Sequence, residues 1–183
     1  MTQAPLRDKD RDWWGEGWYV LIGSAVSIFV IGVAAYLTHE PWVFPSLGPT
    51  AYILFVAPMA VEACPRNVIC GHFIGIVCGV VAVFAFGLTG AGADLPDLQF
   101  RRVCAVTIAL ALTFAVMTWL RVPHAPAGAT TLIVALGLLN SPLDYFVMML
   151  AVVALVAIAN IINRIHGDRP PFWGPVPSAK TLT

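Results

Sequence analysis

The sequence predicts an all-α membrane protein: a helical bundle of four long transmembrane helices plus two short helices that are broken or re-entrant. Of its 183 residues, 59% are hydrophobic and only 11% are charged, and the mean hydropathy is +0.83. A soluble domain of this size could not bury so much apolar surface, whereas lipid accepts an apolar exterior. The six tryptophans fall at the ends of apolar runs, where an aromatic ring prefers the headgroup level.

Four apolar runs are long enough to cross ~30 Å of hydrocarbon as helices. They cover residues 18–37, 68–88, 103–120 and 143–162. Two shorter apolar segments, 43–60 and 125–139, begin with proline, glycine and hydroxyl residues and continue as good helix formers. Irregular backbone is tolerated at membrane depth only where protein or a water-filled cavity covers it. Each short segment is therefore either a re-entrant hairpin or a broken crossing helix.

We expect a mobile cytoplasmic N-terminus, a transmembrane domain and an extended cytoplasmic tail. Their predicted ranges are 1–16, 17–165 (halves about 17–90 and 98–165) and 166–183. With six crossings, all basic residues except Arg101 and Arg102 fall on the side of the termini. With four crossings, Arg66 and Arg121 change places with that pair. In both cases the positive-inside rule places both termini in the cytoplasm of a multi-pass inner or plasma membrane protein.

The two halves resemble each other at an offset of 80 residues. Gly48 and Thr50 align with Gly128 and Thr130, and each half has a long helix, a short segment and a long helix. The identity is thin, and two Gly/Pro-rich turns can also match by chance. If each half crosses three times, the halves form an inverted repeat, in which paired broken segments indicate the binding site.

Three motifs carry a resemblance to a known family. They read PSLGPTAYILF, PRNVICGH and HAPAGATTLIV. In this order they resemble the HPP family of integral membrane proteins, named after a His-Pro-Pro motif. Here that motif is His124-Ala125-Pro126, with alanine in place of the first proline. The resemblance implies transport of a small anion, since nitrite uptake is attributed to plastid and cyanobacterial members.

The two glycine-containing turns are candidate substrate-binding elements. A helix that begins inside the membrane has unpaired N–H groups and an exposed positive dipole end, which together suit an anion. The candidate substrate-binding residues are Ser46, Gly48, Thr50, Gly128, Thr130 and Thr131. In this hypothesis the two glycines face a shared cavity near the membrane midplane. The alternative is that both segments are tight turns with ordinary caps.

Four further residues are candidates for proton transfer or gating: His72, His124, Arg66 and Asn67. A histidine inside an apolar run must be paired, so we expect His72 to face protein and to have a polar partner. Histidine titrates in a range that suits a proton carrier, and His124 precedes the second short segment. The alternatives are an interhelical hydrogen bond, a helix cap and, for Arg66, contact with headgroups.

Other polar and small residues have simpler interpretations. Gly71, Gly75 and Gly79 form a small-xxx-small stripe that permits close helix packing, within one subunit or between subunits of a homo-oligomer. The loop 90–99 and the following Arg101 and Arg102 read as a solvated connector.

The leading functional interpretation is a transporter or channel for a small inorganic anion, most simply nitrite. The expected partners are that anion, the lipid bilayer and further copies of the chain. Because the net charge is zero, we expect no nucleic-acid binding. One alternative is an intramembrane redox or metal enzyme using His39, His72 and His124, and another is a scaffold subunit of a membrane complex. We expect no enzyme, metal or cofactor, because the spans have no metal-ligand spacing and no acidic residue apart from Asp144 at the very start of the fourth.

Overall fold

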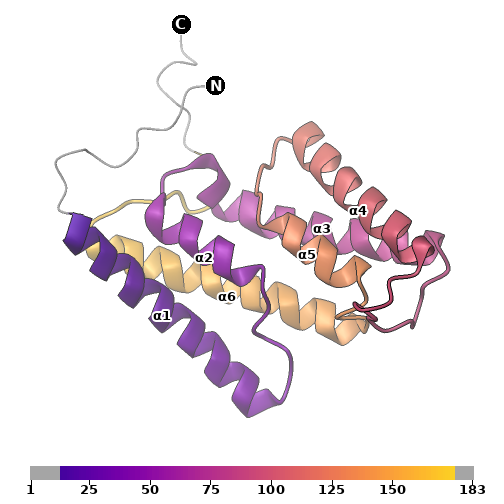
Figure 1. Ribbon diagram of the computed structural model, residues 1–183. Helices are drawn as coiled ribbons and strands as arrows, with labels where there is room; N and C mark the ends of the chain where they lie inside the picture. Colours follow the sequence, from indigo (N-terminus) through magenta and orange to yellow (C-terminus); the bar gives the residue numbers. More distant parts are fainter. Residues whose placement is uncertain (1–12, 176–183) are drawn as a thin grey trace, which may run out of the picture.

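The computed structural model describes residues 13–175, and within this range the chain is helical and has no strand (Figure 1). The helices are α1 (Trp13–Thr38), α2 (Leu47–Val56), α3 (Pro65–Ala85), α4 (Phe100–Trp119), α5 (Ala127–Ala135) and α6 (Pro142–His166), with a 3₁₀ turn, η1 (Val61–Ala63). The all-α prediction is confirmed.

Four of these helices, α1, α3, α4 and α6, are long and apolar enough to cross a membrane. They coincide with the four predicted runs, with ends that differ by a few residues. Helix α1 begins at Trp13, so residues 13–16 are helical, although the sequence placed them in the N-terminal segment. Residues 1–12 and 176–183, which make up most of the two predicted terminal segments, lie outside the described part of the chain.

The two short helices begin near the centre of the molecule and run apart. Helix α2 has 10 residues and α5 has 9, so at 1.5 Å per residue each is about 15 Å long, half of a ~30 Å hydrocarbon layer. Figure 1 shows that successive helices alternate in direction and that α1 begins where α6 ends. This alternation fits the arrangement in which both short helices are parts of broken crossing segments.

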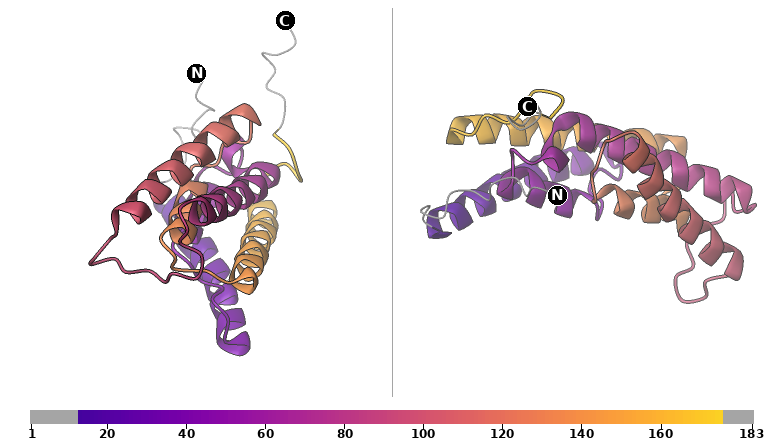
Figure 2. Two further views of the ribbon diagram at one scale, coloured as in Figure 1. Left: turned by 90° about the vertical axis from the view of Figure 1, so that its right-hand side faces the viewer. Right: turned by 90° about the horizontal axis from the view of Figure 1, so that it is seen from above.

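The six helices pack as two groups of three. One group consists of α1, α2 and α6, and the other of α4, α5 and α3. Each group combines the first two helices of one half with the last helix of the other, and α3 contacts α6 between them. Corresponding helices therefore have corresponding neighbours, with α1 and α4 on opposite flanks (Figure 2). This intertwined packing is compatible with an internal repeat, and the inverted relation itself stays a prediction.

The glycine stripe of α3 packs against α5 within the chain. A Cβ atom on Gly75 would lie 2.8 Å from the carbonyl oxygen of Ala127, and one on Gly79 would lie 2.8 Å from Val134. Only glycine permits helix backbones to approach so closely. The stripe is covered by α5, so it is not a contact face between subunits.

The prediction of a solvated connector is wrong for Arg102, which is only 5% exposed. Its guanidinium donates hydrogen bonds to the carbonyl oxygens of Ala135, Ala91 and Gly92, at 2.8–3.2 Å. The last carbonyls of a short helix have no partner in the helix itself, and at membrane depth they need one from protein. Arg102 meets this need for α5, as the Asn163 side chain does for α2 by donating to the Leu54 carbonyl.

Candidate functional site

Buried polar side chains meet where α2 and α5 begin. They are Ser46, Thr50, His72, His124 and Thr130, each at most 1% exposed, and we call them the imidazole–hydroxyl cluster. Ser46 and Thr50 belong to the start of α2, and Thr130 belongs to the first turn of α5. His72 lies two turns into α3, and His124 lies in the connector between α4 and α5. Every cluster member was a candidate from the sequence.

His72 is held between two threonines. Its Nδ1 lies 2.7 Å from Thr130 Oγ1, and its Nε2 lies 3.1 Å from Thr50 Oγ1. Thr50 and Thr130 are the residues that the 80-residue offset pairs. The prediction that His72 faces protein and has a polar partner is confirmed, and both nitrogens have one.

His124 joins the cluster to η1. Its Nδ1 donates to the carbonyl oxygen of Glu62 at 2.9 Å, because a carbonyl can only accept. In the neutral ring the Nε2 atom is then an acceptor. It lies 3.3 Å from Nε2 of His72 and 3.3 Å from Thr50 Oγ1. The two ring centroids are 5.0 Å apart.

The hydroxyl groups continue the network on the other side of His72. Ser46 Oγ lies 2.8 Å from Thr130 Oγ1, and Thr50 Oγ1 donates to the Ser46 carbonyl at 2.8 Å. A continuous hydrogen-bonded chain therefore runs from the Glu62 carbonyl through both imidazoles and Thr130 to Ser46. Within the described residues, no buried nitrogen or oxygen of these side chains lacks a partner.

The electrostatic setting of the cluster favours negative charge. Neither α2 nor α5 contains an Asp, Glu, Lys or Arg. Both helices point their N-terminal ends at the cluster, and each such end carries about half an elementary positive charge. A neutral set of donors at two converging positive dipole ends suits a small anion.

The donors in this site are side chains rather than backbone. The N–H groups of Leu47 and Gly48 bond to the carbonyls of Phe44 and Pro45, at 3.1 and 3.3 Å. In α5, the N–H groups of residues 127–129 bond to the carbonyls of residues 124–126 in the same way, at 3.0–3.1 Å. The prediction of free first-turn N–H groups is wrong, because i→i+3 bonds tighten both helix starts.

The two glycines of the repeat do not face each other, contrary to the sequence-based prediction. Gly48 is exposed, and a Cβ there would have no neighbour within 4 Å. Gly128 is buried, and a Cβ there would lie 2.9 Å from the ring of Phe114. The reason is that the inward face of each short helix is taken by Thr50 or Thr130.

The remaining predicted residues lie around the cluster rather than in it. Thr131 Oγ1 bonds to Thr113 of α4 at 2.8 Å. The Arg66 guanidinium donates to the Asn67 side chain at 3.1 Å and to the Arg121 carbonyl at 3.2 Å, and Asn67 donates to the Val61 carbonyl at 2.8 Å. Arg66 and Asn67 thus join η1 to the α4–α5 connector beside His124.

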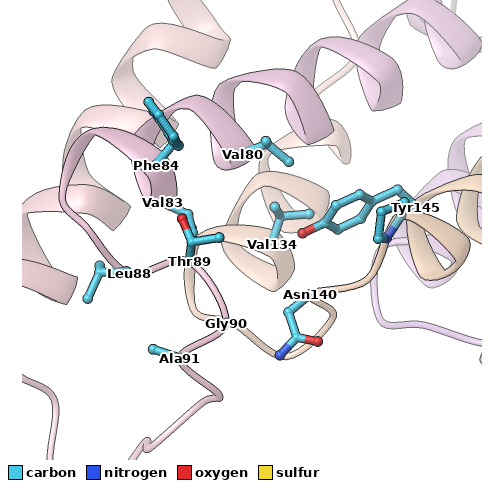
Figure 3. Close-up of a pocket in the computed structure, with 12 residues that line it drawn as sticks. Val80, Val83, Phe84, Leu88, Thr89, Gly90, Ala91, Val134, Asn140 and Tyr145 are labelled. Carbon is cyan, nitrogen blue, oxygen red and sulfur yellow. The ribbon is translucent and has the colours of Figure 1, made fainter.

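A pocket of about 260 Å³ lies at the far end of α5 (Figure 3). Its lining is mostly apolar, and Thr89, Asn140 and Tyr145 supply polar groups. It contains none of the predicted site residues. The C-terminal end of a helix is the negative end of its dipole, so this pocket suits an anion less well than the cluster does.

Sequence reasoning missed Thr113, the Glu62 carbonyl and the buried Arg102. A signal for two of them exists: Arg102, Ala105, Ala109 and Thr113 recur at helical spacing and form the buried face of α4. No sequence signal marks the Glu62 carbonyl. Among the described residues, no three His, Cys, Asp or Glu side chains come together as a metal-binding group.

Comparison with known proteins agrees with the motifs. Residues 9–171 match the family description "HPP, transmembrane region". Two transmembrane proteins of Dictyostelium discoideum are similar, with 28% identity over 70% of this chain and 26% over 93%. These alignments cover 44% and 54% of the relatives, so the chain spans about half of their length. No solved structure matches. This multi-pass transmembrane chain belongs to the HPP family.

Proposed function

We propose that this chain transports a small inorganic anion across a membrane and that the imidazole–hydroxyl cluster is the anion-binding site. The observation that carries the proposal is the complete burial of two imidazoles and three hydroxyls where two positive helix ends converge. An ionisable side chain inside a membrane, such as the two imidazoles here, is costly and is a functional candidate by default. No fixed negative charge lies in α2 or α5 to repel an anion.

The cluster would bind an anion by exchanging hydrogen bonds. In the present arrangement its hydroxyl and imidazole groups satisfy one another. An oxyanion such as nitrite accepts from O–H and N–H donors, so it would replace these bonds at small net cost. The cluster is closed on all sides, and access therefore requires an opening. The contacts of Arg66 and Asn67 next to His124 are the proposed gate, and the Arg66 charge would attract anions to it.

Nitrite is the proposed substrate because of the family resemblance. The proposal also covers the orientation of the chain in the membrane, its oligomeric state and the kind of membrane. Both termini lie in the cytoplasm, the chain forms a homo-oligomer in an inner or plasma membrane, and it is not an enzyme. The orientation is supported by the positive-inside rule, because most of the basic residues fall on the same side of the membrane as the two termini.

Nitrite flux into proteoliposomes made from the purified chain tests the proposal. His72→Ala should reduce flux to the level of protein-free liposomes, since it removes the central group of the cluster. Thr107→Val is the matched control, because Thr107 is exposed and bonds only to a carbonyl of its own helix. Equal insertion of all proteins is verified first. If the intact chain moves neither nitrite nor nitrate above background, the transport proposal fails and a scaffold role is favoured.

A further inference from the structure

The positions of the protons in the neutral cluster follow from one backbone carbonyl. Glu62 O accepts from His124 Nδ1, so Nε2 of His124 must accept. Its neighbour, His72 Nε2, then carries the hydrogen of the second ring. His72 Nδ1 therefore accepts from the Thr130 hydroxyl, and Thr130 in turn accepts from the Ser46 hydroxyl. In this arrangement every nitrogen and hydroxyl has a complementary partner.

A third proton on this pair of rings has one favourable position. With one proton shared between the two Nε2 atoms, the pair gains a charge-assisted bond from imidazolium to imidazole. Two N–H groups side by side at 3.3 Å, both directed at Thr50, would instead repel each other. The added proton therefore resides on His72 Nδ1, which changes from acceptor to donor toward Thr130.

This change reverses the hydroxyl chain. Thr130 Oγ1 now accepts from His72, so its own hydrogen turns toward Ser46, only 2.8 Å away. Ser46 can no longer donate to Thr130, and its O–H is released. One proton on the pair thus creates a positive charge and a free donor at the start of α2.

We propose that uptake of one proton by the His72–His124 pair reverses the Ser46–Thr130 hydrogen bond and makes the Ser46 hydroxyl a donor to the anion, so that one proton accompanies each anion. The anion half of this inference rests on the proposed function, and the proton half does not. The His72–His124 pair binds the proton, and the Ser46 hydroxyl becomes a donor to the anion only when the pair is protonated.

The surroundings of the pair support a single added charge. The helices α2 and α5, which pack around the pair, contain no Asp, Glu, Lys or Arg. The turn η1 contributes the backbone carbonyl of Glu62, which accepts from His124, and Glu62 itself is exposed. On α3, Arg66 is engaged by Asn67 and the Arg121 carbonyl. The charged residues of α4 lie in its first turn, and those of α6 lie in its first turn and its last turn. Among the described residues no Asp or Glu is buried, so a proton together with an anion leaves the cluster neutral, whereas a proton alone does not.

Nitrogen NMR of ¹⁵N-histidine-labelled protein in lipid bilayers tests the proton arrangement directly. A His39→Gln, His166→Gln variant removes the two exposed histidines, and contacts to the Thr130 methyl group identify His72. When both imidazoles are neutral, we expect the hydrogens on His124 Nδ1 and His72 Nε2. On acidification one further proton should appear, and His72 Nδ1 should become protonated. If His72 Nδ1 already carries hydrogen in the neutral pair, or stays bare after the proton is taken up, the inference is overturned.

Proton uptake on nitrite addition tests the coupling. In weakly buffered detergent solution, nitrite binding to the neutral pair should take up about one proton per protein, which requires an affinity for the protonated pair that is higher by roughly a hundredfold or more. Ser46→Ala should keep the acid-induced NMR change and lose most of this uptake, while Thr107→Val should behave as the unmodified protein. Nitrite bound or transported without proton uptake overturns the inference and leaves the proposed function intact. If the NMR result is as expected but the protein neither binds nor transports nitrite, the proposed function and the coupling to an anion are both contradicted. The reversal of the Ser46–Thr130 hydrogen bond on protonation is then still established.

Discussion

Helices α2 and α5 are counterparts in the 80-residue offset, yet the structure holds them in different ways. Helix α5 lies against the glycine stripe of α3, and its backbone carbonyl at Ala127 fills the space where a Gly75 side chain would be. Helix α2 lies against α6. The positions of α6 that match the stripe are Ala151, Leu155 and Ala159, all completely buried.

The difference indicates which of the two short helices can move. Close backbone contact fixes α5 from one side, and Phe114 of α4 covers Gly128 on another. Helix α2 rests on side-chain packing, and its Gly48, Pro49 and Tyr52 are exposed. Two segments that match in sequence therefore have unequal support, and an opening of the cluster is more easily achieved through α2.

The largest effect is expected from Gly75→Leu. Its Cβ would lie 2.8 Å from the carbonyl oxygen of Ala127 and 3.0 Å from Thr131 Oγ1, and no side-chain rotation relieves the contact with the backbone oxygen. We expect destabilisation of about 3 kcal/mol or more and little folded protein. The thermal midpoint in detergent checks this result. Gly32→Leu on α1 is the control, since a Cβ there has no neighbour within 4 Å. Normal stability of Gly75→Leu would mean that α5 is not held by backbone contact.

A pair of glycine substitutions at the helix starts gives the next largest effect. Gly128→Leu meets the Phe114 ring and Leu110, so it should destabilise the protein by about 1–3 kcal/mol through overpacking. Gly48→Leu enters open space and should change stability by about 0.5 kcal/mol or less. Thermal unfolding of both variants under identical conditions measures the difference. Equal effects would show that the two glycines have equivalent surroundings after all, for example through a subunit contact at Gly48.

The sequence was sufficient to predict the four long helices, because twenty apolar residues in a row leave few alternatives. It also identified both short helices, since Pro and Gly interrupt apolar runs at those places. The pairing of α3 with α5 and of α2 with α6 could not be predicted. Small residues at spacing of four mark a close contact, but not the helix that makes it.

Half of the ten predicted site residues come together in the structure, and their role in binding stays a prediction. Ser46, Thr50, His72, His124 and Thr130 all lie in the cluster. The sequence could not show that the first-turn N–H groups bond within their own turns, because this depends on backbone angles that Pro and Gly both permit. It also could not show that His124 meets a carbonyl of η1, since main-chain partners have no residue signature.

The two threonines of the repeat provide a finer test. Thr130→Val removes the link between His72 and Ser46, whereas Thr50→Val leaves that link in place. Each should cost about 1–2 kcal/mol of stability, as expected for one buried hydrogen-bonding group. Nitrite flux should fall about tenfold in Thr130→Val and less in Thr50→Val, in keeping with the same hydrogen-bond energies. Flux measured with and without a pH gradient separates the two. If Thr50→Val alone loses its response to the gradient, the chain of bonds through Thr130 is not the coupling element.

The smallest expected effect concerns motion. Because α2 is held by side chains and α5 by backbone contact, the amides of residues 47–56 should open more readily than those of residues 127–135. We expect the opening free energy of α2 to be lower by about 1–2 kcal/mol, which corresponds to roughly tenfold faster exchange of its amide hydrogens. Hydrogen–deuterium exchange of the protein in lipid nanodiscs, read by mass spectrometry, measures both segments in one sample.

Two further conditions make this comparison decisive. Replacing Leu155 by alanine removes packing from a buried core cluster that includes Leu47, Ala51, Leu54 and Phe55 of α2 but only Ile133 and Val134 of α5. Exchange in residues 47–56 should therefore accelerate more than exchange in residues 127–135. Adding nitrite at acidic pH should slow α2 more than α5, because the anion binds beside Ser46 at the start of α2 and orders the less constrained helix. Exchange that is equal in the two helices, or faster in α5, would mean that the glycine stripe permits sliding rather than fixing α5. In that case the moving element of the cluster would be the half that contains His124.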